Sequence, residues 1–144
     1  MRQSQALAWM PLYRGSITKS KHLVEGVDIT AATGGALRGT PQAAIEEILA
    51  TRTAKLREAS QLAFAFAQRH SIEPLLQAAR RLLPSKSSGN PHDIKFPVAI
   101  SEDLHLVSPR WRPHVAAAAV YSFWGADRAD LPLIQQVRQA VRGV

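Results

Sequence analysis

Residues 40–70 read TPQAAIEEILATRTAKLREASQLAFAFAQRH, and this stretch decides the fold class. Thr40 followed by Pro41 is a favoured helix start, because the hydroxyl caps an orphan N–H and proline at the first helical position gives up no needed donor. No further glycine or proline follows in the stretch, and apolar side chains recur at three- and four-residue steps. They are Ile45, Ile48, Leu49, Leu56, Ala59, Leu62, Ala63 and Phe66. The stretch therefore predicts amphipathic helix.

One unbroken helix over residues 41–70 would be about 45 Å long, which is longer than a domain of this size is wide. We expect a break near residues 51–53, where two β-branched threonines flank Arg52. Ser71 begins a second helix, with Glu73 in its first turn, and Pro84 is predicted to end it. The polar and turn-forming residues 84–91 then predict a linker.

The linker separates a helical pair at 41–83 from a three-helix group at 92–144. In that group we expect a helix to about Val107 that contains Pro97, a tight turn at 109–112, a helix at 113–124 capped by Gly125, and a last helix after Asp130. Residues 114–124 are apolar on every side, which is typical of a buried helix. The sequence thus predicts an all-α protein, a compact bundle of about five helices in which the other four surround this central one.

Residues 1–40 differ from this helical domain at 41–144. They carry five of the eight glycines and an excess of basic residues, and no helical period persists in them. We expect an irregular basic N-terminal arm with one strand-like stretch at 23–30, and a flexible loop at the glycine-rich residues 33–36. The basic, acid-poor start is also compatible with an organellar transit peptide, although a cytoplasmic location is our first expectation. The longest apolar run, 115–124, is half of the ~20 residues that cross a bilayer, so no membrane span is predicted.

Composition excludes several classes of protein. The 144 residues are 46% apolar, which is enough for one domain with a core and too much for a disordered chain. The absence of cysteine removes disulfides, thiolate metal sites and cysteine nucleophiles. The net charge of +7 leaves nucleic-acid binding open, but the basic residues are dispersed, which is also what a solubility or steering role requires.

One candidate metal site lies on the third predicted helix. Glu102 and His105 are three residues apart, which puts a carboxylate and an imidazole on one helix face, and His92 lies at the edge of that face. No cofactor is predicted from the sequence, and a divalent metal ion held by Glu102, His105 and His92 is the alternative hypothesis. A solvated polar face explains the same spacing without any ligand.

Two further groups of residues could bind an anion or another ligand. Lys95 lies near His92 and Asp93, a set that could bind an anion and transfer a proton. The motif SPRWRPH at 108–114 places two guanidinium groups beside an indole, which suits a phosphate or carboxylate. Its candidate binding residues are Arg110, Trp111, Arg112 and His114. A tryptophan that only plugs the bundle is the alternative.

No complete catalytic constellation, nucleotide-binding loop or nucleic-acid motif is present in the sequence. Our leading hypothesis is therefore a non-enzymatic helical module that binds a partner protein or itself, as a portion of a larger or oligomeric assembly. A small metal- or anion-dependent helical enzyme using the polar face at 92–107 is the second hypothesis. A nucleic-acid-binding protein is the third.

Overall fold

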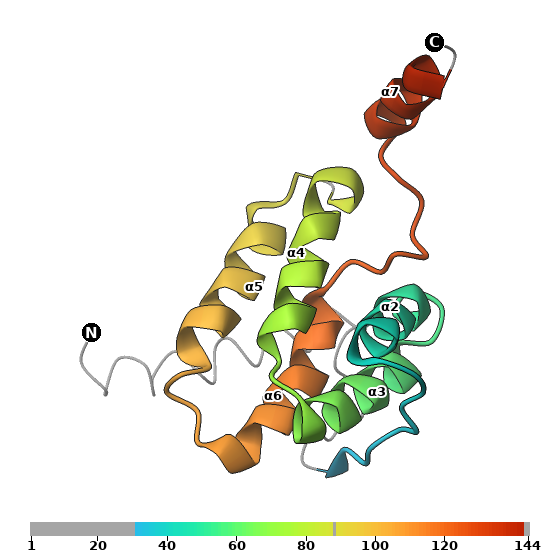
Figure 1. Cartoon of the computed structure of the whole chain (residues 1–144). Helices are drawn as coiled ribbons and strands as arrows, with labels where there is room; N and C mark the ends of the chain where they lie inside the picture. The colour runs from blue at the N-terminus through green and yellow to red at the C-terminus, as the bar shows by residue number, and fades with distance from the viewer. Residues whose placement is uncertain (1–30, 88, 143–144) are drawn as a thin grey trace, which may run out of the picture.

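Six α-helices make up the part of the chain that the computed structural model describes, residues 31–87 and 89–142, and no strand occurs in that part (Figure 1). The helices are α2 (Pro41–Thr51), α3 (Leu56–Arg69), α4 (Glu73–Lys86), α5 (Pro91–Asp103), α6 (Arg112–Ala119) and α7 (Pro132–Arg142), with 3-10 turns η2 (Pro109–Trp111) and η3 (Val120–Ser122). The all-α prediction is confirmed. The predicted strand-like stretch and most of the basic arm lie outside the described residues.

The predicted break in the first helix is confirmed, and its cause is partly long-range. Thr40 Oγ1 accepts a hydrogen bond from Ala43 N at 3.2 Å and begins α2, which ends at Thr51. In the turn that follows, Arg52 donates from Nε to Val120 O at 3.1 Å and from Nη2 to Tyr121 O at 2.7 Å. The turn is therefore bonded to the segment after α6, which fixes where α3 begins.

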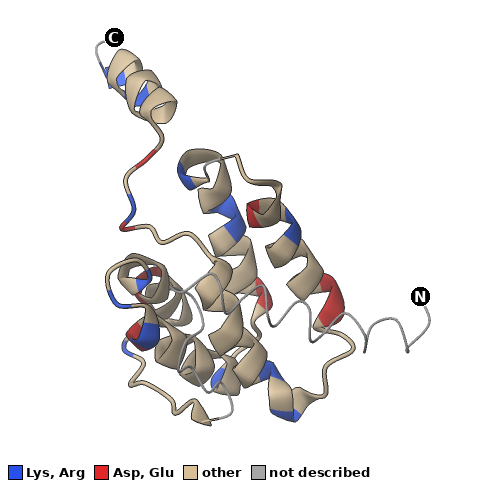
Figure 2. Cartoon of the chain, turned by 180° about the vertical axis from the view of Figure 1, so that it is seen from behind, with Lys and Arg blue, Asp and Glu red and all other residues tan. Residues whose placement is uncertain are grey.

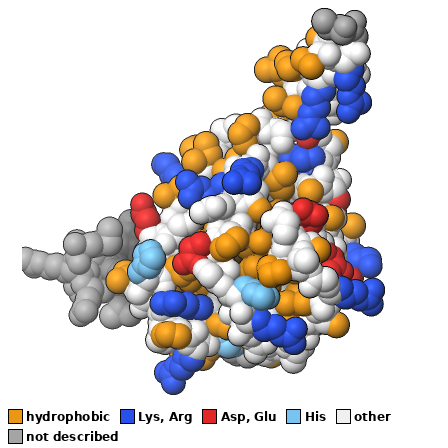
Figure 3. Space-filling model, in the orientation of Figure 1, with side chains coloured by type: hydrophobic (Ala, Val, Ile, Leu, Met, Phe, Trp, Pro, Cys, Tyr) orange, Lys and Arg blue, Asp and Glu red, His pale blue; other side chains and the backbone are white. Residues whose placement is uncertain are grey.

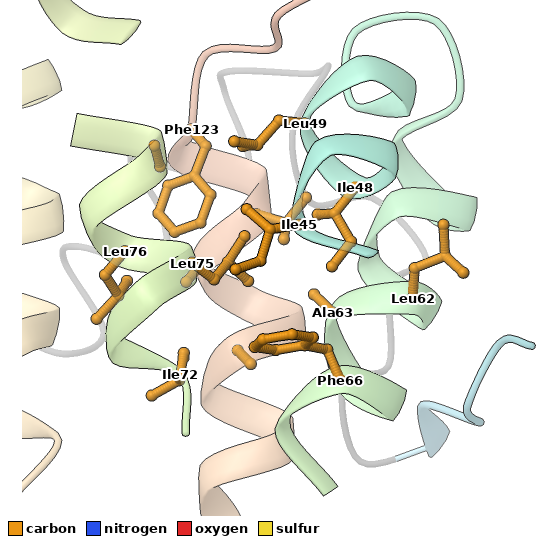
Figure 4. Close-up of a cluster of buried hydrophobic side chains, with 14 of the residues drawn as sticks. Ile45, Ile48, Leu49, Leu62, Ala63, Phe66, Ile72, Leu75, Leu76 and Phe123 are labelled. Carbon is orange, nitrogen blue, oxygen red and sulfur yellow. The ribbon is translucent and has the colours of Figure 1, made fainter. Parts of the chain in front are cut away.

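Helices α2, α3 and α4 converge on one hydrophobic core with α6 and η3 (Figure 4). The α6 side chains Ala116, Ala117 and Ala119 are fully buried, as expected for the central helix, although Ala118 faces solvent. Small side chains let α3 pack closely on α6, and the buried Ser60 hydroxyl donates to Ala117 O at 3.0 Å. The inner side chains drawn in Figure 4 point toward one another from three different helices, so the bundle closes around α6.

The glycine-rich segment predicted to be a flexible loop packs along α3 instead. Gly35 N donates to Gln61 O at 3.1 Å, and a Cβ on Gly35 would lie 3.1 Å from Leu62 Cδ2. Nearby, Leu37 packs against the core. The missing side chain allows the backbone to approach α3 this closely, so this part of the arm belongs to the bundle.

Several element ends differ from the sequence prediction. The helix predicted at 113–124 is α6, which ends at Ala119 and passes into η3. Helix α4 continues past Pro84 to Lys86, so the linker begins at Ser87 rather than at Pro84. Helix α5 ends at Asp103, four residues before Val107. Gly125 is not a left-handed cap, since only Gly39 and Gly89 have positive φ among the described residues. Gly125 is buried, and a Cβ there would lie 3.0 Å from Thr53 N, so glycine is required for close approach.

The last helix is placed differently from the prediction. Helix α7 was expected to help cover the central helix, but it stands apart from the bundle at the end of the extended segment that follows η3 (Figure 1). No residue of α7 is buried. Five helices, α2 to α6, therefore form the bundle, and α7 projects from it.

Candidate functional site

The residues of the predicted metal site do not form a metal-binding group in the described part of the chain. His92 and Glu102 are exposed on α5, and His105 is exposed in the turns beyond its end. Within residues 31–87 and 89–142 no three His, Asp or Glu side chains gather in a geometry that could hold a metal ion. The divalent-metal hypothesis stays a prediction, without support from this arrangement.

The SPRWRPH motif forms a short stack of rings at the start of α6. Arg110 Cζ lies 5.5 Å from the ring centroid of Trp111, whose ring centroid is 4.9 Å from that of His114. His114 in turn meets Phe64 edge-on at 5.0 Å. Trp111 is 42% exposed, so it does not plug the bundle. Lys95 is exposed on α5 and is not one of the residues of this stack.

Arg112 lines a cavity of about 420 Å³ at the turn between α3 and α4. Arg69, His70, Ser71 and Glu73 lie on its wall, and sequence reasoning did not single out this place. Arg112 Nε donates to Val107 O at 3.3 Å. Neither Arg69 nor Arg112 takes part in an ion pair among the described residues. The wall carries charges of both signs, so it does not define one class of ligand.

Helix α7 presents the clearest unpartnered surface. Leu133, Val137 and Val141 are 68%, 50% and 72% exposed, and their four-residue spacing puts them on one side of the helix, which we call the α7 stripe. The opposite side is polar. It consists of Gln135, Gln136, Arg138, Gln139 and Arg142. Figure 3 shows hydrophobic side chains along one side of the projecting helix and basic ones on the other.

The base of α7 is attached to the bundle by a buried ion pair. Lys86 Nζ lies 2.9 Å from Asp130 Oδ1, and their side chains are only 10% and 11% exposed. Arg138 Nη1 on the first turns of α7 lies 2.6 Å from the other oxygen of Asp130. The hydrogen bond from Lys86, together with the charge of Arg138, outweighs desolvation and lowers the pKa of Asp130. Asp130 therefore ties α4 to α7 as a carboxylate.

Three hydrogen bonds to backbone carbonyl oxygens complete this attachment. Lys86 Nζ donates to Ala126 O at 3.2 Å and also to Arg128 O, and Leu131 N donates to Ser85 O at 2.8 Å. These bonds fix the segment before α7 against the end of α4. The apolar side of α7 is thus held away from the bundle core by specific contacts.

A second exposed line of side chains runs down α5. Phe96, Ala99, Asp103 and Leu106 are all exposed, and their steps of three, four and three residues place them on one side of the helix and of the turns that extend it. We call this line the α5 strip. Phe96 and Leu106 are 46% and 84% exposed. The strip joins two large apolar side chains through one acidic residue.

Comparison with known protein families, with curated proteins and with solved structures finds no match for this chain. The fold and its surfaces define the class of protein instead, namely an all-α bundle with one projecting amphipathic helix. None of the described helices is long and apolar enough to cross a membrane.

Proposed function

We propose that this protein is a non-enzymatic interaction module that uses α7 as a docking helix on the surface of a protein partner. The observation that carries the proposal is the exposure of the α7 stripe on a helix whose base is bonded to the bundle. Covering one large apolar side chain contributes about 1.5–3 kcal/mol. Three such side chains along one side of a helix are typical anchors for a helix in an apolar groove.

The charges of α7 specify the chemistry of the partner. The helix carries Arg138 and Arg142 and no acidic residue (Figure 2). Arg138 lies at the flank of the α7 stripe and is already paired with Asp130, whereas Arg142 on the polar side takes part in no ion pair among the described residues. A protein surface that is apolar at its centre and acidic at its rim therefore complements α7.

The length of α7 is a second argument for a covering partner. Isolated helices shorter than about 12–15 residues are marginal in water, because nucleation is costly and most helix stability in proteins comes from tertiary packing. Helix α7 has 11 residues and buries none of them. Docking of the stripe supplies the packing that the chain's own bundle does not.

Site-specific photo-crosslinking in cells that produce the full chain tests this function. A photoreactive residue at Val137 on the stripe should give a discrete protein adduct, and the same residue at Gln139 on the polar side should not. Leu133→Glu in the Val137-labelled chain should abolish the adduct, because it places a charge in the docked surface. Equal labelling from both sides of α7, or adducts with lipid or nucleic acid instead of protein, would overturn the proposal.

A further inference from the structure

We infer that the partner of α7 is a second copy of this chain, and that the α7 stripe of each copy docks on the α5 strip of the other. This inference rests on the proposed function, since it names the surface that α7 covers. A twofold axis would relate the two contacts. The α7 stripe of the first copy meets the α5 strip of the second, and the α7 stripe of the second meets the α5 strip of the first.

The first argument is where the exposed apolar side chains lie. Seven large hydrophobic side chains are exposed in the described residues, and all of them fall in two short regions of the chain. Leu133, Val137 and Val141 form the α7 stripe, and the others are Ile94, Phe96, Leu106 and Trp111, on α5 and the turns after it. The apolar side chains of both regions are exposed to solvent in the single chain. Contact between the two regions would bury both sets.

The second argument is charge complementarity. Helix α7 carries only basic charged residues, whereas α5 carries three acidic residues against one lysine (Figure 2). Asp103 lies within the α5 strip, next to Glu102, and neither takes part in an ion pair among the described residues. Pairing of α7 with another α7 would instead place two helices of the same positive net charge side by side, which is unfavourable.

The third argument is dimension. Leu133 to Val141 spans about 12 Å of helix and Phe96 to Leu106 about 15 Å, at 1.5 Å per residue. A single contact of this length covers only a small area, whereas a stable interface typically buries about 1,200–2,000 Å² in total. Two reciprocal contacts double the buried area, which favours a symmetric dimer over a single docking event.

The surfaces do not meet within one chain. Phe96, Leu106 and the three stripe residues are exposed together in the single copy. The contacts of Lys86 with Asp130 and of Leu131 with Ser85 hold the base of α7 at the end of α4. A second copy is therefore needed to bring a stripe onto a strip.

Sedimentation of the purified full chain over a wide concentration range is the first part of the test. We expect a monomer–dimer equilibrium. Val137→Glu and Leu106→Glu should each raise the dimer dissociation constant by about tenfold or more. Gln139→Glu on the polar side of α7 is the matched control and should leave it nearly unchanged. Circular dichroism should show all three variants folded, because the altered side chains are exposed.

Crosslinking gives the second part, because the chain has no cysteine and an introduced one is unique. Val137→Cys and Leu106→Cys chains are mixed with a short bis-maleimide linker. The mixed product should form faster than either like-with-like product, and Gln139→Cys should give little of it. Faster Val137→Cys self-linking, or normal dimerisation of Leu106→Glu, would overturn the inference in favour of α7 pairing with α7.

A chain that stays monomeric at every concentration would also overturn it. In that case a face-specific photo-adduct at Val137 would leave the proposed function standing with a different protein partner. Loss of face specificity in that experiment would remove the proposed function itself, so the two failures are distinguishable.

Discussion

Helices α2 and α7 are alike in sequence and opposite in environment. Both have 11 residues, both begin at a proline, and both carry an apolar stripe. In α2 the stripe residues Ile45, Ile48 and Leu49 are 3%, 0% and 5% exposed. In α7 every stripe residue is at least half exposed. A helical period thus predicts which side of a helix is apolar, but not which surface covers that side.

Replacing a stripe leucine by alanine in each of the two helices should give the largest difference in the free energy of unfolding. Leu49→Ala should lower the free energy of unfolding by about 2–5 kcal/mol, because it removes a buried side chain and leaves a cavity. Leu133→Ala, at a 68% exposed position, should change it by less than about 0.5 kcal/mol. Denaturant unfolding of the dilute protein measures both. Equal losses would mean that α7 packs against its own bundle.

The attachment of α7 to the end of α4 should give the next largest effect on the free energy of unfolding. Lys86→Met should cost about 1–3 kcal/mol, because it removes a charged hydrogen-bond donor and leaves Asp130 poorly compensated. Lys55→Met is the control, since Lys55 is 66% exposed and pairs with Glu58 on the surface. Faster amide exchange at Leu131 should accompany the Lys86 change. If both lysine variants lose the same stability, the attachment is not structural.

Acid should weaken two carboxylate contacts of the segment before α7, that of Asp127 with the turn between α2 and α3 and that of Asp130 with Lys86, without acting on the apolar core. Desolvation raises the pKa of Asp127, but hydrogen bonds from Thr53 and Ala54 outweigh it, so the net pKa is lowered, as it is for Asp130. A lowered folded-state pKa gives stability that is complete above the unfolded value of about 3.9 and lost as pH falls through the folded value. The melting temperature should therefore drop on acidification below about pH 4.

Asp127→Asn is the control for this pH dependence. The variant should be less stable than the natural sequence near neutrality, and its melting temperature should fall less steeply below pH 4, roughly the range in which the carboxylate would titrate. An unchanged slope in the variant would show that Asp127 does not contribute to the acid response.

Local patterns were sufficient for the helical elements but not for their ends. Thr40 and Pro41 predict the start of α2, and the break before Leu56 follows from helix length. The end of α4 was misplaced because Lys86 is held by carbonyl groups of residues 126 and 128 and by Asp130, which lie some forty residues away. Pro84 predicts the end of the helix, but tertiary contacts carry α4 past it to Lys86.

The candidate surfaces show the same limit. The apolar side of the last helix was visible in the sequence, yet its exposure depends on the attachment through Asp130, for which no local motif exists. The α5 strip could not be predicted, because the spacing of apolar residues does not show whether a side chain such as Phe96 is covered in the fold. The polar residues proposed as a site, His92, Glu102 and His105, are exposed, but spacing along one helix could not show whether residues from other elements join them.

Hydrogen exchange of the α7 amides at low and high protein concentration tests the central claim most directly. An uncovered 11-residue helix protects its amides poorly. We therefore expect near-complete exchange of α7 in dilute protein and clear protection in concentrated protein, while α2 stays protected in both. Protection of α7 at both concentrations, or at neither, would contradict the account.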